Sequence, residues 1–231
     1  MTRNDLMAER LKAVQQRIAR ACEQAGRSPD SVTLLPVSKT FPVPCVQQAM
    51  ELGLHRFAEN RMQDLRDKSQ ALAIHRLDWV MIGHLQTNKV REAAHYASEV
   101  QSLDRLALAQ ALQQRLLLEE RQLDVLIQVK TSREPTKHGV AVDQLMEFAD
   151  QLSDFSQLRV QGLMTIAEHH ADEQRVRACF AQLRDLRDRL QARGHTNITR
   201  LSMGMSGDLE LAIAEGATEV RVGSAIFGER L

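Results

Sequence analysis

Aromatic residues and cysteines are scarce in this chain of 231 residues. Aromatic side chains make up 3%, with one tyrosine and one tryptophan, so few rings are available to stack on nucleic acid bases. The three cysteines, Cys22, Cys45 and Cys179, are odd in number, far apart and without metal-ligand spacing. This pattern predicts reduced thiols in a cytoplasmic protein.

Net charge and long hydrophobic runs are lacking as well. The 30 basic and 30 acidic residues balance, which gives no support for binding to nucleic acid or to an anionic membrane surface. No run of residues approaches the apolar length of a membrane span, and the opening segment is charged rather than signal-like. The sequence therefore predicts no nucleic acid partner and no membrane association.

Apolar runs and amphipathic segments alternate along the chain. After an opening helix at residues 4–25, we predict strands at 33–38, 55–58, 79–83, 99–103, 124–130, 159–164, 199–203 and 218–223. Helices are predicted between them, at 44–53, 61–73, 86–97, 104–120, 141–153, 172–193 and 207–215. Strict alternation indicates a parallel sheet. Eight such units indicate an α/β fold, a (β/α)8 TIM barrel with an extra N-terminal helix, formed by residues 1–231 as a single domain.

A doubly wound open sheet is the alternative arrangement. It would usually carry a glycine-rich turn after the first strand, and residues 37–42 contain no glycine. In a barrel, functional groups gather at the C-terminal ends of the strands. The polar residues that follow each apolar run are therefore the first candidates for a functional site.

Lys39 directly follows the first predicted strand. At the mouth of a barrel its amine would be partly desolvated, which disfavours the charged form and lowers the pKa of a lysine. A neutral amine can attack an aldehyde and form a Schiff base. The alternative is a surface lysine that only ends the strand.

The last two strands each end in a glycine and serine turn. We expect Gly223 and Ser224, at the start of a short helix over 224–228, to form a phosphate site, because a helix start exposes N–H groups and partial positive charge. No Walker lysine stands beside it, which favours a phosphorylated cofactor or metabolite over a nucleoside triphosphate. Ser206 is expected to be the N-cap of the helix over 207–215. For a single glycine, tight turn geometry would be a sufficient explanation.

Arg221 stands inside the last predicted strand, between Val220 and Val222. Because side chains alternate along a strand, either the arginine or the two valines point into the barrel. An inward guanidinium needs a partner. Glu59 or Asp104 could form an ion pair with it, or it could face a nitrogen acceptor on a ligand.

These residues fall within a series of motifs that closely resembles the pyridoxal 5'-phosphate homeostasis proteins. That family consists of single-domain relatives of the alanine racemase barrel, the fold-type III architecture, and the resemblance covers nearly the whole chain. The motifs are Val37-Ser38-Lys39-Thr40, Phe57-Ala58-Glu59-Asn60, the stretch 82–89 beginning Ile82-Gly83-His84, Gly162-Leu163-Met164-Thr165, the stretch 201–206 and the stretch 221–228.

The resemblance implies a binding site for pyridoxal 5'-phosphate. Lys39 would hold the cofactor as an aldimine. Ser202, Gly223 and Ser224 would bind its phosphate, and Arg221 would face the pyridine nitrogen.

Further residues take roles by the same resemblance. Asn60 and Met203 would line the cofactor ring, with His84 nearby. Ala58 stands where the family more often has glycine. Lys137 matches a lysine that is linked to a secondary cofactor site in some relatives. No metal site is predicted.

The function implied is intracellular vitamin B6 homeostasis, in which the protein carries or buffers pyridoxal 5'-phosphate and passes it to apo-enzymes as recipients. An arginine beside the pyridine nitrogen can only donate, so it keeps that nitrogen neutral. A two-base racemase needs an acid or base on each face of the cofactor. The relatives with that activity take a tyrosine from a second domain, whereas Tyr96, the one tyrosine here, is predicted to be helical.

Two alternative functions remain open at this point. One is a weak pyridoxal phosphate-dependent amino acid racemase that uses Lys39 with water or a histidine. The other is a barrel without enzymatic activity that binds a sugar phosphate. Without the second domain of the racemases, we expect a monomer.

Overall fold

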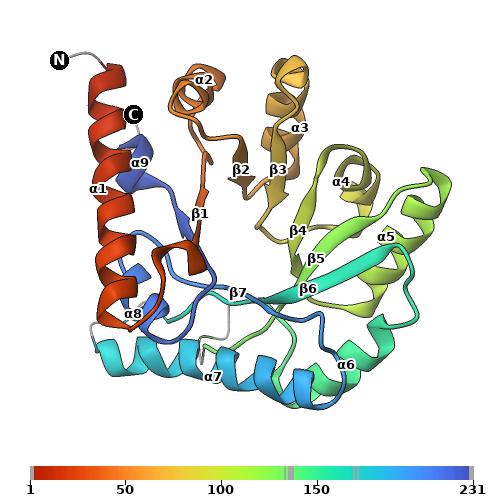
Figure 1. The fold of residues 1–231 in the computed structure, drawn as a ribbon. Helices are drawn as coiled ribbons and strands as arrows, with labels where there is room; N and C mark the ends of the chain where they lie inside the picture. Colours follow the sequence, from red (N-terminus) through yellow and green to blue (C-terminus); the bar gives the residue numbers. More distant parts are fainter. Residues whose placement is uncertain (1–2, 133, 135–137, 169, 171, 229–231) are drawn as a thin grey trace.

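The computed structural model describes residues 3–132, 134, 138–168, 170 and 172–228 (Figure 1). Its strands are β1 Thr33–Pro36, β2 Arg56–Glu59, β3 Asp78–Met81, β4 Glu99–Leu103, β5 Leu123–Gln128, β6 Leu158–Met164, β7 Arg200–Ser202 and β8 Glu219–Val222. Its α-helices are α1 Arg3–Gln24, α2 Val43–Glu51, α3 Met62–Ala71, α4 Val90–Tyr96, α5 Leu106–Leu118, α6 Leu145–Leu152, α7 Glu173–Ala192, α8 Leu209–Ala214 and α9 Ser224–Phe227. Short 3-10 helices occupy Pro29–Ser31, Ala73–His75, Thr87–Lys89 and Val142–Gln144.

The eight strands form one parallel sheet in the order β1-β8-β7-β6-β5-β4-β3-β2. The two ends of this order meet through an isolated parallel bridge between Val37 and Ala58, where the Ser38 N–H donates to the Ala58 carbonyl at 3.0 Å. The sheet is therefore a nearly closed barrel, and the predicted (β/α)8 fold is confirmed. A doubly wound sheet would instead have two free edges.

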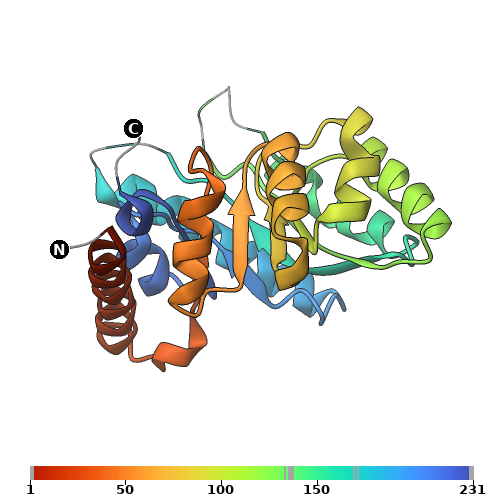
Figure 2. The same ribbon diagram turned by 90° about the horizontal axis from the view of Figure 1, so that it is seen from above.

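Helices surround the strands on the outside, and α1 lies apart from the alternating series, beside α8 and α9 (Figures 1 and 2). An ion pair fastens it there, with Arg17 Nε 2.7 Å from Glu210 Oε1. Most apolar burial lies between the strands and the helices, in a core that includes Phe57, Leu112 and Phe180. Burial of such aliphatic and aromatic side chains drives the closure of the ring.

The structure corrects the predicted start of one helix. We expected Ser206 to cap the helix over 207–215, but α8 begins at Leu209 and Asp208 occupies the N-cap position. The Ser206 carbonyl instead accepts a hydrogen bond from Arg17 Nη2 at 3.0 Å. A contact from α1, almost 190 residues earlier in the chain, thus sets the loop that the local sequence pattern assigned to helix.

Four charged residues close the N-terminal end of the barrel. Arg56, Glu99, Arg200 and Glu219 each stand at the first position of their strand. Arg56 lies 3.0 Å from Glu99 and 2.6 Å from Glu219, and Arg200 lies 2.7 Å from Glu99 and 3.0 Å from Glu219. Because β2, β4, β7 and β8 are not all neighbours in the sheet, these ion pairs tie opposite walls of the barrel together.

Glu219 is the most deeply buried of these four charged side chains. Burial pushes the pKa of its carboxyl upward, but the guanidinium groups of Arg56 and Arg200 outweigh that effect, so the pKa of Glu219 is lowered. A lowered pKa contributes stability above the usual carboxyl pKa, and that contribution is lost as the pH falls through the lowered value.

Among the described residues, no helix has both the length and the apolar character needed to cross a membrane.

We predict that Glu219→Ala lowers the free energy of unfolding by about 3–5 kcal/mol at neutral pH, because it removes a fully buried carboxylate and leaves the part-buried guanidinium groups of Arg56 and Arg200 to share Glu99 alone. Urea denaturation at pH 7 measures the change. The control is Glu210→Ala, which breaks a half-exposed pair and should cost at most about 1 kcal/mol. Equal losses in the two variants would contradict a special role for the buried cluster.

Candidate functional site

A cavity of about 480 Å³ opens at the C-terminal ends of the strands. Five of the predicted site residues line it: Lys39, Asn60, Arg221, Gly223 and Ser224. Its wall also contains residues that sequence reasoning did not assign to a ligand site, namely Val37, Thr40, Phe41, Ile82, Gly83, Ile166, Met205, Ser206, Gly207 and Gly228. Ile82 and Ile166 follow β3 and β6 closely, so the strand-end rule could have found them, whereas Phe41 and Gly228 carry no such signal.

The turn after β1 presents Lys39 to this cavity. The Ser38 carbonyl accepts from the Phe41 N–H at 3.1 Å, which closes the turn around Lys39. Thr40 has φ of 69°, a left-handed conformation that is rare for a β-branched residue. Local strain of this kind persists only where surrounding contacts enforce it, and it is concentrated at functional sites.

A buried ion pair enforces the turn. Lys68 Nζ lies 2.5 Å from Glu59 Oε1 and donates to the Ser38 carbonyl at 2.8 Å, while the Ser38 hydroxyl donates to the same Glu59 oxygen at 2.6 Å. The other oxygen, Glu59 Oε2, is buried and has no hydrogen-bond partner. Burial therefore raises the pKa of Glu59, even though Lys68 and Ser38 act in the opposite direction.

Asn60 reaches the cavity because Gly83 lets two strand ends approach closely. A Cβ atom at residue 83 would lie 2.0 Å from the Asn60 carbonyl oxygen, a distance that no side chain can occupy. The Ile82 N–H donates to the Glu59 carbonyl at 2.9 Å and holds the two segments together. Glycine at position 83 is thus required by the backbone contact that places Asn60.

Arg221 points into the barrel, and Val220 and Val222 belong to the outer core. Of the two alternatives for Arg221, the ion pair with Glu59 or Asp104 is not formed, because Glu59 is paired with Lys68 and Asp104 with Arg105. Arg221 instead donates to the Ser202 hydroxyl at 2.8 Å and to the Thr165 carbonyl at 2.7 Å. Burial lowers the pKa of Arg221 to about 10, which leaves the group protonated at neutral pH with neutral hydrogen-bond partners.

A buried relay fixes the direction of these hydrogen bonds. Gln101 Nε2 donates to Glu99 at 2.7 Å and to Glu219 at 2.5 Å, so the amide oxygen must face the other way, toward Ser202. The Ser202 hydroxyl donates to that oxygen at 2.7 Å and accepts from Arg221. The ion-pair cluster at the far end of the barrel therefore sets the position of the Arg221 guanidinium.

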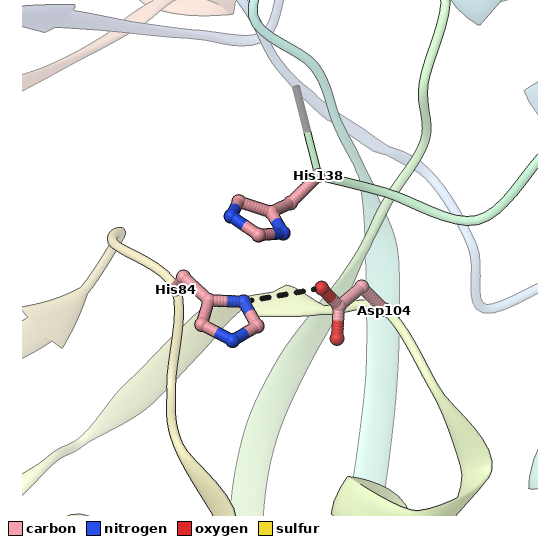
Figure 3. Close-up of side chains that lie close together, drawn as sticks. All are labelled: His84, Asp104 and His138. Carbon is pink, nitrogen blue, oxygen red and sulfur yellow. Dashed lines mark ion pairs between the residues drawn. The ribbon is translucent and has the colours of Figure 1, made fainter. Parts of the chain in front are cut away.

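The remaining predicted site residues lie elsewhere. Ser202 and Met203 are fully buried and are not among the described residues that line the cavity. His84 lies with Asp104 and His138 in a separate cluster at the same end of the barrel (Figure 3). Lys137 is outside the described residues.

Two glycine-containing segments, at Gly207 and Gly223, also line the cavity. Gly223 is the N-cap residue of α9, and a Cβ there would lie 3.1 Å from the Val37 carbonyl oxygen. The first N–H groups of a helix have no partner within the helix, so this end offers donors to an anion. At Gly207 an added Cβ would meet nothing within 4 Å, which leaves the backbone there open to a ligand.

Comparisons with known proteins agree on one family. The model of the alanine racemase N-terminal domain family matches residues 10–231. The chain is 42% identical over 222 residues to a pyridoxal phosphate homeostasis protein of Aquifex aeolicus, covering 96% of this chain and 97% of that protein. It is 38% identical over 230 residues to the protein of the same name from Escherichia coli K12, covering 98% and 97%. The chain belongs to the pyridoxal phosphate homeostasis protein family.

Solved structures extend these comparisons. The structure of PipY from Synechococcus elongatus without pyridoxal phosphate superposes with a TM-score of 0.87 at 36% identity, covering 96% of this chain and 100% of PipY. PipY with pyridoxal phosphate bound gives a TM-score of 0.85 at 35% identity, with the same coverage. An alanine racemase of Clostridium difficile gives 0.77 at 12% identity, covering 96% of this chain and 57% of the racemase, a likeness of fold alone.

We predict that Lys68→Met strongly destabilises the protein at neutral pH, by about 3–5 kcal/mol, because it leaves the Glu59 carboxylate buried without its cation. The raised pKa of Glu59 destabilises the folded state as the pH rises through that pKa. The stability lost in Lys68→Met should therefore shrink as the pH is lowered toward 5. Urea denaturation across this pH range measures the effect.

The matched control for Lys68→Met is the double variant Glu59→Gln/Lys68→Met. It removes the charge along with its partner and should recover much of the lost stability at neutral pH. If the double variant is no more stable than the single one, the buried charge is not the cause.

Proposed function

We propose that this protein binds pyridoxal 5'-phosphate in the cavity at the C-terminal ends of the strands and acts in vitamin B6 homeostasis as a carrier or buffer of that cofactor. The observation that carries the proposal is the convergence of a lysine, a buried arginine and a helix-start glycine on one cavity. The names of relatives at about 40% identity over nearly the whole chain support it, as does the PipY structure with the cofactor bound.

The chemistry of the donor set fits the cofactor. The cavity volume of about 480 Å³ falls within the usual range for small-molecule sites, roughly 300–1,000 Å³. Ile82 and Ile166 give it an apolar surface for a ring, and Arg221 supplies N–H donors that cannot accept a proton. The turn at Gly223 and Ser224 offers backbone donors for a phosphate group.

Pyridoxal 5'-phosphate supplies an aldehyde that reacts reversibly with a primary amine. Lys39 provides that amine, and the strained turn at Thr40 fixes where it stands. With the cofactor bound, Arg221 would donate to the pyridine nitrogen and disfavour its protonation, which would weaken the electron withdrawal that amino acid chemistry requires. The residues of the site therefore favour holding the cofactor over using it.

The proposal extends to partners and location. A carrier that holds a reactive aldehyde reversibly limits its free concentration and can deliver it to apo-enzymes. We expect a cytoplasmic location, since Cys22, Cys45 and Cys179 are all free. We also expect the protein to be a monomer.

We predict that Lys39→Ala abolishes covalent capture of pyridoxal 5'-phosphate, because no other lysine is among the described residues that line the cavity. The purified protein is mixed with the cofactor, its visible absorbance recorded, and the mixture reduced with borohydride before peptide mapping. The wild-type protein should carry the reduced cofactor on Lys39. The control is Lys12→Ala, an exposed lysine on α1, which should label as the wild type does. Labelling spread over several exposed lysines would overturn the proposal.

A weak racemase remains the second candidate, favoured by the likeness of the barrel to alanine racemase and by Lys39 as one base. Against it, Tyr96 lies in α4 and its hydroxyl accepts from Gln70 Nε2 at 2.7 Å, away from the residues that line the cavity. Alanine or serine is incubated with the loaded protein in deuterated water, and the α-proton is followed by NMR. A carrier leaves the α-proton in place, whereas rapid exchange that Lys39→Ala removes would establish an enzyme.

A further inference from the structure

We propose that His84, Asp104 and His138 form a binding site for a divalent transition-metal ion. Zinc, which is redox-inactive, is the ion of this class that we choose for the test. The three residues lie outside the cofactor cavity, at the C-terminal rim of the barrel (Figure 3). They come from three segments: the end of β3, the end of β4 and the loop after β5. The proposal is independent of whether the cavity holds pyridoxal phosphate.

The spacing of the ligand atoms is close to what one ion needs. One nitrogen or oxygen from each residue can be chosen so that all three atoms lie within 4.8 Å of one another, and His84 Nδ1 lies 3.4 Å from Asp104 Oδ2. At bond lengths of about 2.1 Å, two ligands of one zinc ion stand roughly 3.0–3.4 Å apart. The pair of His84 Nδ1 and Asp104 Oδ2 already has this separation, and the nitrogen of His138 must come closer to complete the site.

Asp104 is held in place for such a role. Its side chain is 8% exposed, and Arg105 Nη1 binds its Oδ1 at 2.5 Å, which leaves Oδ2 on the side of the histidines. The same Arg105 donates through Nη2 to the Leu85 carbonyl at 2.8 Å. One arginine therefore fixes the carboxylate and the segment that carries His84 relative to each other.

The backbone around His138 is fixed as well. Gln128 Nε2 donates to the His138 carbonyl at 3.0 Å, and the adjoining Val140 N–H donates to the Gln128 carbonyl at 2.8 Å. Gly139 adopts φ of 137°, and a Cβ there would lie 2.7 Å from the Lys130 nitrogen. Residues 138–140 are therefore packed tightly against the end of β5, which leaves the imidazole of His138 to adjust.

The histidine rings define what binding would require. They stack with centroids 4.1 Å apart and planes 21° apart, so their in-plane lone pairs do not converge on one point. Because His84 already faces Asp104, the exposed His138 ring is the one that turns about its side-chain torsions. Both side chains are exposed, so no core packing opposes the rotation.

The ligand set selects the class of ion. Two imidazole nitrogens with one carboxylate suit zinc, nickel, cobalt or copper, whereas calcium and magnesium prefer sites made of oxygen. Three protein ligands leave coordination positions for water, so the site is open rather than closed. The carboxylate supplies one negative charge, and the cation of Arg105 is directed at its other oxygen.

We predict that the full chain binds one zinc ion per molecule at this cluster. Calorimetric titration at about pH 7.5, where histidine is neutral, measures stoichiometry and affinity. The double variant His84→Ala/His138→Ala should weaken binding at least about tenfold, since even loss of an outer partner of a metal ligand costs that much. Cobalt as a probe should give visible ligand-field bands that this variant loses and that added zinc displaces.

The matched control removes two other exposed imidazoles, in His55→Ala/His75→Ala. It should bind zinc and cobalt as the wild-type chain does. Asp104→Asn tests the carboxylate separately, and unchanged thermal denaturation without metal shows that each variant is folded. The proposal is overturned if the wild-type chain binds no zinc, or if both double variants lose affinity equally.

Discussion

The orientation of one buried amide group decides how the functional end of this barrel is arranged. Gln101 gives both of its amide hydrogen bonds to carboxylates, Glu99 and Glu219, and can only accept at its oxygen. That constraint passes through the Ser202 hydroxyl to the guanidinium of Arg221. Buried polar groups are costly unless every hydrogen bond is made, so such a relay is rigid. The position of the Arg221 guanidinium in the cavity wall is therefore set by buried residues that do not line the cavity.

The period of a β-strand explains why this relay exists. Side chains two positions apart on a strand point to the same face. On β4 and β8, the first residue of such a pair belongs to the layer of ion pairs, and the second belongs to the next layer toward the C-terminal ends of the strands. Glu99 stands below Gln101, and Glu219 stands below Arg221. Barrel interiors are filled in such layers. On the other side of the ring the interior is apolar, with Leu35, Val37, Ala58 and Val80, so the polar column occupies one half of the barrel.

Sequence reasoning found the fold and five of the residues that line the cavity, and its failures have physical reasons. Alternation of strands and helices locates all eight units. The strand-end rule locates Lys39, and the family resemblance adds Asn60 and Arg221. The partners of Arg221 were missed because they are chosen by the packing of β4, β6 and β7, which no local pattern encodes. Ser206 was misassigned because Arg17 on α1 holds its carbonyl. The cluster at His84 joins residues more than 50 positions apart, and neither spacing nor composition reveals it.

A single bridge between β1 and β2 completes the ring. The order of the strands determines at which stage of translation the cavity can form. Lys39 and Asn60 leave the ribosome early, but Arg221, Gly223 and Ser224 belong to the last strand and the helix that follows it. β8 lies between β1 and β7, so the ring cannot close until β8 has been translated. A nascent chain therefore exposes Lys39 without the surrounding cavity from the synthesis of β1 until that of β8 and α9, and the complete cavity forms only after both have folded into place.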